Sequence, residues 1–280
     1  MVSKLLKIFG NYTRALEILY LLNNIKKSVR LDANEIELEK IAKFCKEENL
    51  CMEISDFKVI KAVDKGKGNY ANTAKKVSIN YPYNGFYHIY ISKNKSVAKM
   101  LKLVENKNDD NAIGQLLGYP KCCIDFFVEN REKQQKIQND YILEALSNSY
   151  GFSFPFYTNY AIRYFDFALL SHFPHSFNCE ASIKIAKANF ECLKQASESI
   201  AIRFEKMLKS AVLYTENSGI FLFQDYKMEN NIFKFGKFLS TSTAIMDEML
   251  TENKKIEVIS KNKVRIKDKF FTDVGFMVFT

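Results

Sequence analysis

The spacing at which apolar residues recur changes twice along this chain of 280 residues. Between Cys51 and Ser92 apolar and polar residues alternate, and this alternation predicts three short strands. From Lys93 to about Tyr214 apolar residues recur every three or four positions, which is typical of helices that bury one face. Alternation resumes in the stretch that follows. Helices and strands therefore occupy separate stretches of the chain, and this predicts the α+β class.

These changes predict three portions of the chain. Residues 1–92 form a helix-plus-strand portion, with helices expected over residues 5–27 and 34–48. Residues 93–214 form a helical portion, and residues 215–280 form a β-rich portion. With only 10 Gly and 4 Pro in the whole chain and no internal repeat, nothing marks a linker. The three portions are therefore compatible with one compact body or with two lobes.

The cellular compartment decides what the cysteines can do. The best apolar stretch, residues 15–22, contains Glu17 and falls short of the roughly 20 apolar residues that span a membrane. Lys7 interrupts the first apolar run, so we find no signal-peptide core and expect a cytoplasmic protein without a membrane partner. In a reducing compartment the six cysteines are free thiols, metal ligands or catalytic groups rather than disulfides.

One motif resembles a known chemical signature in the wrong structural context. Residues 66–71 satisfy the loose Gly-x-Gly-x-x-Gly/Ala pattern of dinucleotide-binding loops, but a strand at 77–80 follows where that loop needs a helix. We interpret the segment as a hairpin loop. Phosphate-binding P-loops, the serine-hydrolase elbow and the His-Glu-x-x-His zinc motif do not occur. His88, on an alternating strand, is expected to be a half-buried core residue.

A vicinal cysteine pair begins the informative part of the chain. Gly118 is expected to end one short helix, and Pro120 suits the first turn of the next. Cys122 and Cys123 then lie in or beside the N-terminal turn of a helix. Unpaired backbone N–H groups and the positive end of the helix dipole stabilise thiolate over thiol at such a place. This is the environment of a metal ligand or a nucleophile.

A second motif follows about fifty residues later. His172, His175 and Cys179 have a spacing short enough for a loop and a helix start to converge on one ion, with Asn178 as N-cap of a long helix that continues to about Ala211. Cys122 or Cys123 would complete a tetrahedral zinc site or an iron–sulfur cluster site. The alternative is that the cysteines are small core residues and the histidines cap a loop. We favour the metal site because three of the six Cys and two of the three His lie in these motifs.

The two motifs resemble the signature of an uncharacterised prokaryotic family, notably archaeal, a domain-of-unknown-function group. That signature reads Gly-Tyr-Pro-x-Cys-Cys followed by His-x-Pro-Cys-x-x-x-Cys, and the resemblance covers roughly residues 85–185. His175 stands where the signature has Cys. Histidine replaces cysteine readily as a zinc ligand and less often as a cluster ligand, so the departure favours zinc or leaves a cluster with an unusual ligand. The resemblance implies no particular activity; it supports only that these residues belong together.

Charged and aromatic residues lie near the motifs. Residues 150–177 are rich in Phe and Tyr, which can stack nucleobases or line a substrate pocket, although a well-buried helix explains their spacing better. Arg163 stands one helical turn before Asp166, and Asp125 one turn before Glu129; such pairs most often lie on a solvated face. If they face the cysteines, Arg163 binds an anionic substrate, and Asp125 orients a histidine ligand or acts as general acid–base.

Two functions of different classes remain open. The first is a zinc- or iron–sulfur-dependent enzyme that acts on a small or nucleotide-like anionic substrate, because paired thiolates at helix starts are reactive. The net charge of +9 and the pI near 9.0 agree with an anionic partner. The alternative is an RNA- or DNA-binding module with a structural zinc site and a basic hairpin over residues 256–266. Lysines on such an edge also guard against aggregation. The basic residues of this run are Lys254, Lys255, Lys261, Lys263, Arg265, Lys267 and Lys269.

Overall fold

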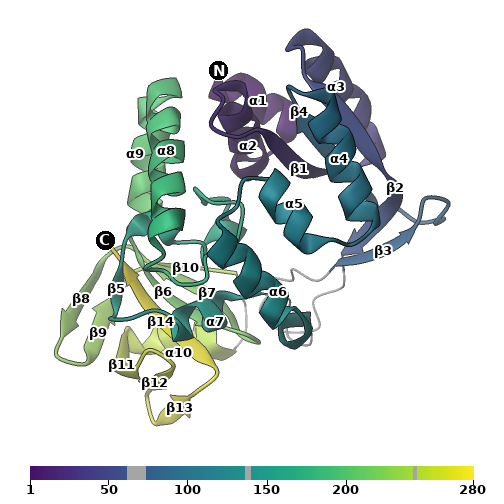
Figure 1. Cartoon of the computed structure of the whole chain (residues 1–280). Helices are drawn as coiled ribbons and strands as arrows, with labels where there is room; N and C mark the ends of the chain where they lie inside the picture. Colours follow the sequence, from purple (N-terminus) through teal and green to yellow (C-terminus); the bar gives the residue numbers. More distant parts are fainter. Residues whose placement is uncertain (62–73, 136–139, 242–244) are drawn as a thin grey trace. The chain divides into compact units, whose positions relative to one another are not determined.

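A computed structural model of the chain describes residues 1–61, 74–135, 140–241 and 245–280 (Figure 1). It confirms the α+β class and the β-rich C-terminal stretch. The chain divides into two compact units. Unit 1 comprises Met1–Ala62, Thr73–Arg131 and Ala188–Glu198, and unit 2 comprises Val63–Asn72, Glu132–Lys187 and Ser199–Thr280. The loop expected at residues 66–71 lies outside the described residues.

Unit 1 contains a four-stranded antiparallel sheet in the order β1-β4-β2-β3 (Figure 1). Its strands are β1 (Ser28–Ala33), β2 (Cys51–Lys61), β3 (Ala74–Ser78) and β4 (Phe86–Ser92). The three strands expected between residues 51 and 92 are confirmed, and β1 is an additional strand. Helices α4 (Lys95–Asn106) and α5 (Asp110–Leu116) pack on Tyr90 of β4, while the neighbouring Ile89 and Ile91 are equally buried. The sheet is therefore covered on both faces.

The N-terminal helices differ in detail from the expectation. One helix was expected over residues 5–27, but α1 (Val2–Phe9) and α2 (Tyr12–Leu22) are separate, because Gly10 ends α1 with a φ of 84°. Helix α3 (Glu35–Glu47) begins at a capping box formed by Asn34 and Glu37, which confirms the second expected helix. Ile36 was expected on its buried face and is 90% exposed. It precedes the first buried turn of the helix.

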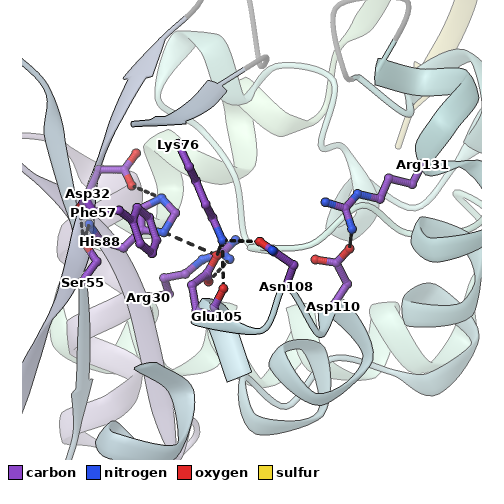
Figure 2. A network of polar contacts seen from close by, with 10 residues as sticks. All are labelled: Arg30, Asp32, Ser55, Phe57, Lys76, His88, Glu105, Asn108, Asp110 and Arg131. Carbon is purple, nitrogen blue, oxygen red and sulfur yellow. Dashed lines mark hydrogen bonds and ion pairs between the residues drawn. The ribbon is translucent and has the colours of Figure 1, made fainter. Parts of the chain in front are cut away.

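A network of charged side chains crosses unit 1 around the carboxylate of Glu105 on α4 (Figure 2). Glu105 accepts a hydrogen bond of 2.7 Å from Arg30 Nη1 on β1. It also forms an ion pair of 3.1 Å with Lys76 Nζ on β3. The His88 ring on β4 lies between the carboxylates of Asp32, 3.3 Å from Nε2, and Glu105, 3.7 Å from Nδ1. His88 is thus a mostly buried member of an ion network, and three strands converge on one side chain of α4.

The ionisation of Glu105 contributes to the stability of this network. Burial opposes the charged form, but His88 and Arg30 outweigh burial and hold the pKa of Glu105 well below its ordinary value of 4.5. A carboxyl whose pKa is lower in the folded than in the unfolded state stabilises the fold above the unfolded pKa. That contribution is lost as the pH falls below about 4.5 toward the folded pKa.

Unit 2 is built on two five-stranded sheets. Their strands are β5 (Ser153–Phe154), β6 (Ala211–Thr215), β7 (Gly219–Phe223), β8 (Tyr226–Glu229), β9 (Ile232–Phe235), β10 (Phe238–Ser240), β11 (Lys255–Ser260), β12 (Lys263–Ile266), β13 (Lys269–Phe271) and β14 (Val274–Phe279). The strand order is β10-β7-β6-β14-β5 in one sheet and β13-β12-β11-β9-β8 in the other. The paired strands run antiparallel except for β14 and β5. Phe233 of one sheet and Phe276 of the other pack edge to face at 5.0 Å, inside a core that both sheets and α10 (Ile245–Asn253) share. The hairpin expected at residues 256–266 is confirmed as β11 and β12.

The central stretch is helical only in part. Helices α6 (Lys121–Gln135), α7 (Ile142–Ser147), α8 (Glu180–Ala196) and α9 (Glu198–Leu208) are present. The long helix expected from residue 179 to 211 breaks at Ser197 and ends at Leu208, although no strand interrupts it. The expectation of a buried helix in the aromatic stretch is wrong: residues 153–165 form β5 and two single 3₁₀ turns, Phe156–Thr158 and Arg163–Phe165. Within the described ranges, no helix is both long and apolar enough to cross a membrane.

Replacing Glu105 with Ala should lower the free energy of unfolding by about 3–5 kcal/mol at neutral pH, because it leaves Arg30 and Lys76 without their buried counter-charge. Urea unfolding at several pH values measures the effect. The difference from the wild type should shrink as the pH falls below about 4.5. Glu39→Ala, at an exposed position of α3, serves as control and should change stability by no more than about 0.5 kcal/mol. An equal loss in both variants would contradict the role of the network.

Candidate metal centre

The turn between α5 and α6 places the vicinal cysteines. The N–H of Gly118 donates to the carbonyl of Gln115 at 3.1 Å, and the N–H of Tyr119 donates to that of Gly114 at 2.9 Å. With a φ of 78° at Gly118, this is a Schellman ending of α5. The next helix begins directly, because the Pro120 carbonyl accepts hydrogen bonds from the N–H groups of Cys123 and Ile124. The expectation that Cys122 and Cys123 lie in a helix N-terminal turn is confirmed.

The two cysteines occupy different environments within that turn. Cys122 is exposed, whereas Cys123 is 2% exposed. Their Sγ atoms are 3.9 Å apart. The start of α6 is held close to α5, because a Cβ on Gly114 would lie 2.7 Å from Cγ1 of Ile124. The pair therefore presents two nearby sulfur atoms from a fixed helix start, one facing solvent and the other facing the protein interior.

Cys179 lies immediately before α8 (Glu180–Ala196). It occupies the N-cap position, whereas the sequence predicted Asn178 there and Cys179 in the first turn. Its Sγ accepts a hydrogen bond of 3.4 Å from the backbone N–H of Ser182, which is the contact that an N-cap side chain makes. Asn178, the expected N-cap, instead accepts a hydrogen bond at Oδ1 from the N–H of Tyr150. Cys179 is 4% exposed. The Cys179 sulfur therefore occupies the N-cap position of α8.

Buried hydroxyl groups hold the loop that carries His175. Ser149 Oγ accepts a hydrogen bond of 2.8 Å from the N–H of Phe177 and lies 3.2 Å from Ser176 Oγ. The carbonyl of His175 itself accepts a hydrogen bond from Asn148 Nδ2. Asn148 and Ser149 stand 27 or 28 positions before the residues that they contact in the His175 loop. No local sequence motif therefore indicates the groups that fix this loop.

The structure brings four of the five predicted ligands together. Cys122, Cys123, His175 and Cys179 each offer one ligand atom, and these atoms all lie within 4.8 Å of one another. The set contains both Cys122 and Cys123, whereas the sequence predicted one of the two as the fourth ligand. Three of the four residues are buried or half-buried, and Cys122 is exposed. Three thiol groups and one imidazole form a donor set that suits a soft transition-metal ion.

His172, the fifth predicted ligand, is not in this group. Its Nε2 lies 2.9 Å from Ser182 Oγ, and the residue is 7% exposed. Ser182 therefore contacts two residues of the second motif: its N–H donates to the Cys179 sulfur, and its hydroxyl meets the His172 ring. Sequence spacing could not separate His172 from His175, because both stand in the same loop three positions apart.

The two charged residues predicted to assist catalysis have intrachain partners. Asp125 accepts a hydrogen bond of 2.6 Å from Lys121 one helical turn earlier, on the exposed side of α6. Arg163 forms an ion pair of 2.9 Å with Asp140, and both side chains are at least nine-tenths buried. Burial opposes the charge of Arg163, but Asp140 and nearby tyrosines outweigh burial and raise its pKa. The catalytic roles of Asp125 and Arg163 stay predictions, and Asp140 is a partner that the sequence did not indicate.

The other cysteines lie outside the group. Cys45 and Cys192 are buried, and Cys51 is half-buried. Burial, followed by the neighbouring Cys51, raises the pKa of Cys45 to about 12, and burial also raises the pKa of Cys192. The raised pKa values favour the protonated form of both thiols, and neither belongs to the ligand group.

Several cations of the basic hairpin already have partners within the chain. Arg265 pairs with Glu257 on the adjacent strand, and Lys267 pairs with Glu252 of α10. Lys261 donates to the backbone carbonyls of Leu146 and Ser149. These contacts leave fewer cations for phosphate groups than the sequence suggested. Nucleic-acid binding by this hairpin stays a prediction.

Comparison with known proteins agrees with the expected type of family. No curated protein and no solved structure matches the chain. Residues 91–209 match the model of a family described as "protein of unknown function (DUF483)". This range contains the Cys122–Cys123 pair and the segment from His172 to Cys179. The part of the chain that carries the four grouped ligands is therefore similar to an uncharacterised family, whose description states no activity.

Proposed function

We propose that Cys122, Cys123, His175 and Cys179 bind one zinc ion. A tetrahedral zinc site with Zn–S bonds of about 2.3 Å places its ligand sulfurs about 3.8 Å apart. The 3.9 Å between the sulfurs of Cys122 and Cys123 fits that separation, and this is the observation that carries the proposal. Three Cys and one His form one of the common donor sets of structural zinc sites.

The same distances favour a single ion over an iron–sulfur cluster. In a cubane cluster the protein ligands bind different iron atoms, so the ligand atoms stand farther apart than around one ion. The four donor atoms here lie within 4.8 Å of one another. His175 in place of a fourth thiol also suits zinc better than a cluster.

A structural role follows from the number of ligands. Four protein ligands fill a tetrahedral zinc site, whereas a catalytic zinc keeps one position for water or substrate. The ion would hold the start of α6 and the start of α8 at one point, although more than fifty residues separate these cysteines in the sequence. The N–H of Ser182 supports the thiolate form of Cys179 that a zinc ligand needs.

Anaerobically purified protein should contain one zinc per chain by elemental analysis, without the visible charge-transfer bands of an iron–sulfur cluster. Cys179→Ser should lower the zinc content at least about tenfold, because it removes one of four ligands. Cys192→Ser is the matched control, since it changes a buried thiol of α8, the helix that Cys179 precedes, outside the ligand group. Iron with charge-transfer bands would instead support a cluster. Zinc contents that are equal in both variants would refute the site.

The sequence pattern included both His172 and His175 as ligands, whereas the proposed site includes only His175. His175→Ala should reduce zinc affinity at least about tenfold, measured by competition with a chromophoric chelator. His172→Ala should retain one zinc per chain, because its ring contacts Ser182 rather than the ligand group. Some loss of affinity through Ser182 and Cys179 is expected, but smaller than that of His175→Ala. The reverse order would show that the ligand assignment is wrong.

An enzymatic role is a second candidate, favoured by the exposure of Cys122. The other three members of the group are buried or half-buried, so Cys122 is the thiol that an electrophilic substrate reaches first. If Cys122 is a nucleophile, iodoacetamide should label the zinc-loaded protein once, at this residue, as mass spectrometry of peptides would show. If the site is structural only, labelling should wait for zinc removal by a chelator.

A further inference from the structure

Unit 2 contains a pocket whose lining includes none of the four grouped ligand residues. Its volume is about 650 Å³, within the range of about 300–1,000 Å³ that small-molecule sites have. The end of α6, helix α7, the turn between β6 and β7, the turn between β11 and β12, and the start of β14 line it. All of these lining residues belong to the same compact unit. The turn of the basic hairpin therefore forms one wall of a ligand-sized pocket.

The charge in this pocket is opposite to that of the whole chain. Lys133 pairs with Glu144, and Lys261 donates to the carbonyls of Leu146 and Ser149, so both ammonium groups in the wall are engaged. Glu216 and Asp273 also line the pocket, and within the described residues neither carboxylate has an ion-pair partner. The pocket therefore presents unbalanced negative charge in a protein whose net charge is +9.

A buried acceptor in the wall lacks a partner. Gln134, near the end of α6, is 1% exposed, and in the described part of the chain its Oε1 atom has no hydrogen-bond partner. Leaving such a buried polar atom unsatisfied costs about 1–3 kcal/mol, so a donor supplied by a ligand would be favoured. Gln134 and the two free carboxylates are all acceptors. The polar part of the pocket is complementary to a ligand that carries N–H donors and positive charge.

The rest of the wall is apolar. Leu143 and Leu146 of α7, Phe152 and Val274 supply hydrocarbon surface to the pocket. A single metal ion would leave most of the 650 Å³ and all of this apolar surface unused. An organic cation uses both parts, because its charged group meets the carboxylates and its hydrocarbon part contacts the apolar wall.

We propose that this pocket binds a small organic ammonium or amidinium compound, with Glu216 and Asp273 contacting the cationic group and Gln134 Oε1 accepting one of its N–H donors. The apolar wall holds the hydrocarbon part of the ligand. This site is independent of the metal centre and would remain if no zinc were bound.

The electrostatics of Glu216 agree with this assignment. Burial, and then the neighbouring carboxylates of Asp273 and Asp140, raise the pKa of Glu216 above its ordinary value, while Lys133 opposes the rise. Burial and nearby like charges both disfavour the charged form of Glu216, and a bound cation would favour it. Binding should therefore be accompanied by a lower pKa of Glu216.

Three probes of the same shape and different charge test the proposal on the full chain. They are phenethylamine, phenethyl alcohol and 3-phenylpropionate, titrated at neutral pH by calorimetry and ligand-observed NMR. Phenethylamine should bind at least about tenfold more tightly than either isostere. Glu216→Gln and Asp273→Asn should each weaken phenethylamine binding at least about fivefold. Glu248→Gln, at an exposed position of α10 outside the pocket, should leave binding unchanged.

The outcomes are distinguishable. Absence of binding by all three probes, equal binding of the three, or preference for 3-phenylpropionate would overturn the proposal. Equal weakening by Glu216→Gln and Glu248→Gln would show that binding is not at the pocket. Asp273 is exposed at a turn, so Asp273→Asn keeps the test valid if Glu216→Gln disturbs folding, which circular dichroism would show.

Discussion

Backbone N–H groups at a helix start have no partners within the helix, and the arrangement of both cysteine motifs depends on this constraint. At α6 the turn is prepared by Gly118 and Pro120, which bring Cys122 and Cys123 into the first helical turn. At α8 the sulfur of Cys179 itself accepts a free N–H group. Partial positive charge at both starts favours thiolates, which are the form that binds metal. Two helix ends that would each need a cap thus supply ligands to the same group.

The local part of this arrangement was predictable from the sequence, and the non-local part was not. Gly118, Pro120 and the cysteine pair follow rules for helix ends that operate over a few residues, so the start of α6 was expected correctly. His172 differs from His175 in that its ring contacts the hydroxyl of Ser182, in the first turn of α8. This contact depends on the folded position of α8 and cannot be inferred from the spacing of the two histidines. Arg163, predicted to bind an anionic substrate if it faces the cysteines, forms an ion pair with Asp140, which stands 23 residues earlier in the chain. The spacing of apolar residues gives no indication of such an ion pair.

Apolar spacing also misled where aromatic residues are dense. The segment from residue 150 to 177 has the composition of a buried helix, yet it contains a short strand and two 3₁₀ turns. Its aromatic rings pack against other elements of unit 2, as Phe154 does against Phe279 of β14, and against one another, as Phe154 does against Phe177. Large rings can fill a core from an irregular backbone as well as from a helix, so their burial does not determine the backbone conformation. Net charge is a similarly coarse guide, since a basic chain contains a pocket lined by Glu216 and Asp273, neither of which has an ion-pair partner within the described residues.

Strand β14 has a consequence for the order in which unit 2 can be assembled during synthesis. It lies between β6 and β5 in its sheet, and its pairing with β5 joins residues more than a hundred positions apart. The ribosome produces β5, β6 and β7 long before β14, so the nascent chain exposes the open edge of β6 until residue 279 is available. Such late closure of a sheet gives a high contact order, and the waiting edge is open to pairing with other chains. Protection of that edge by a chaperone would matter most in this interval.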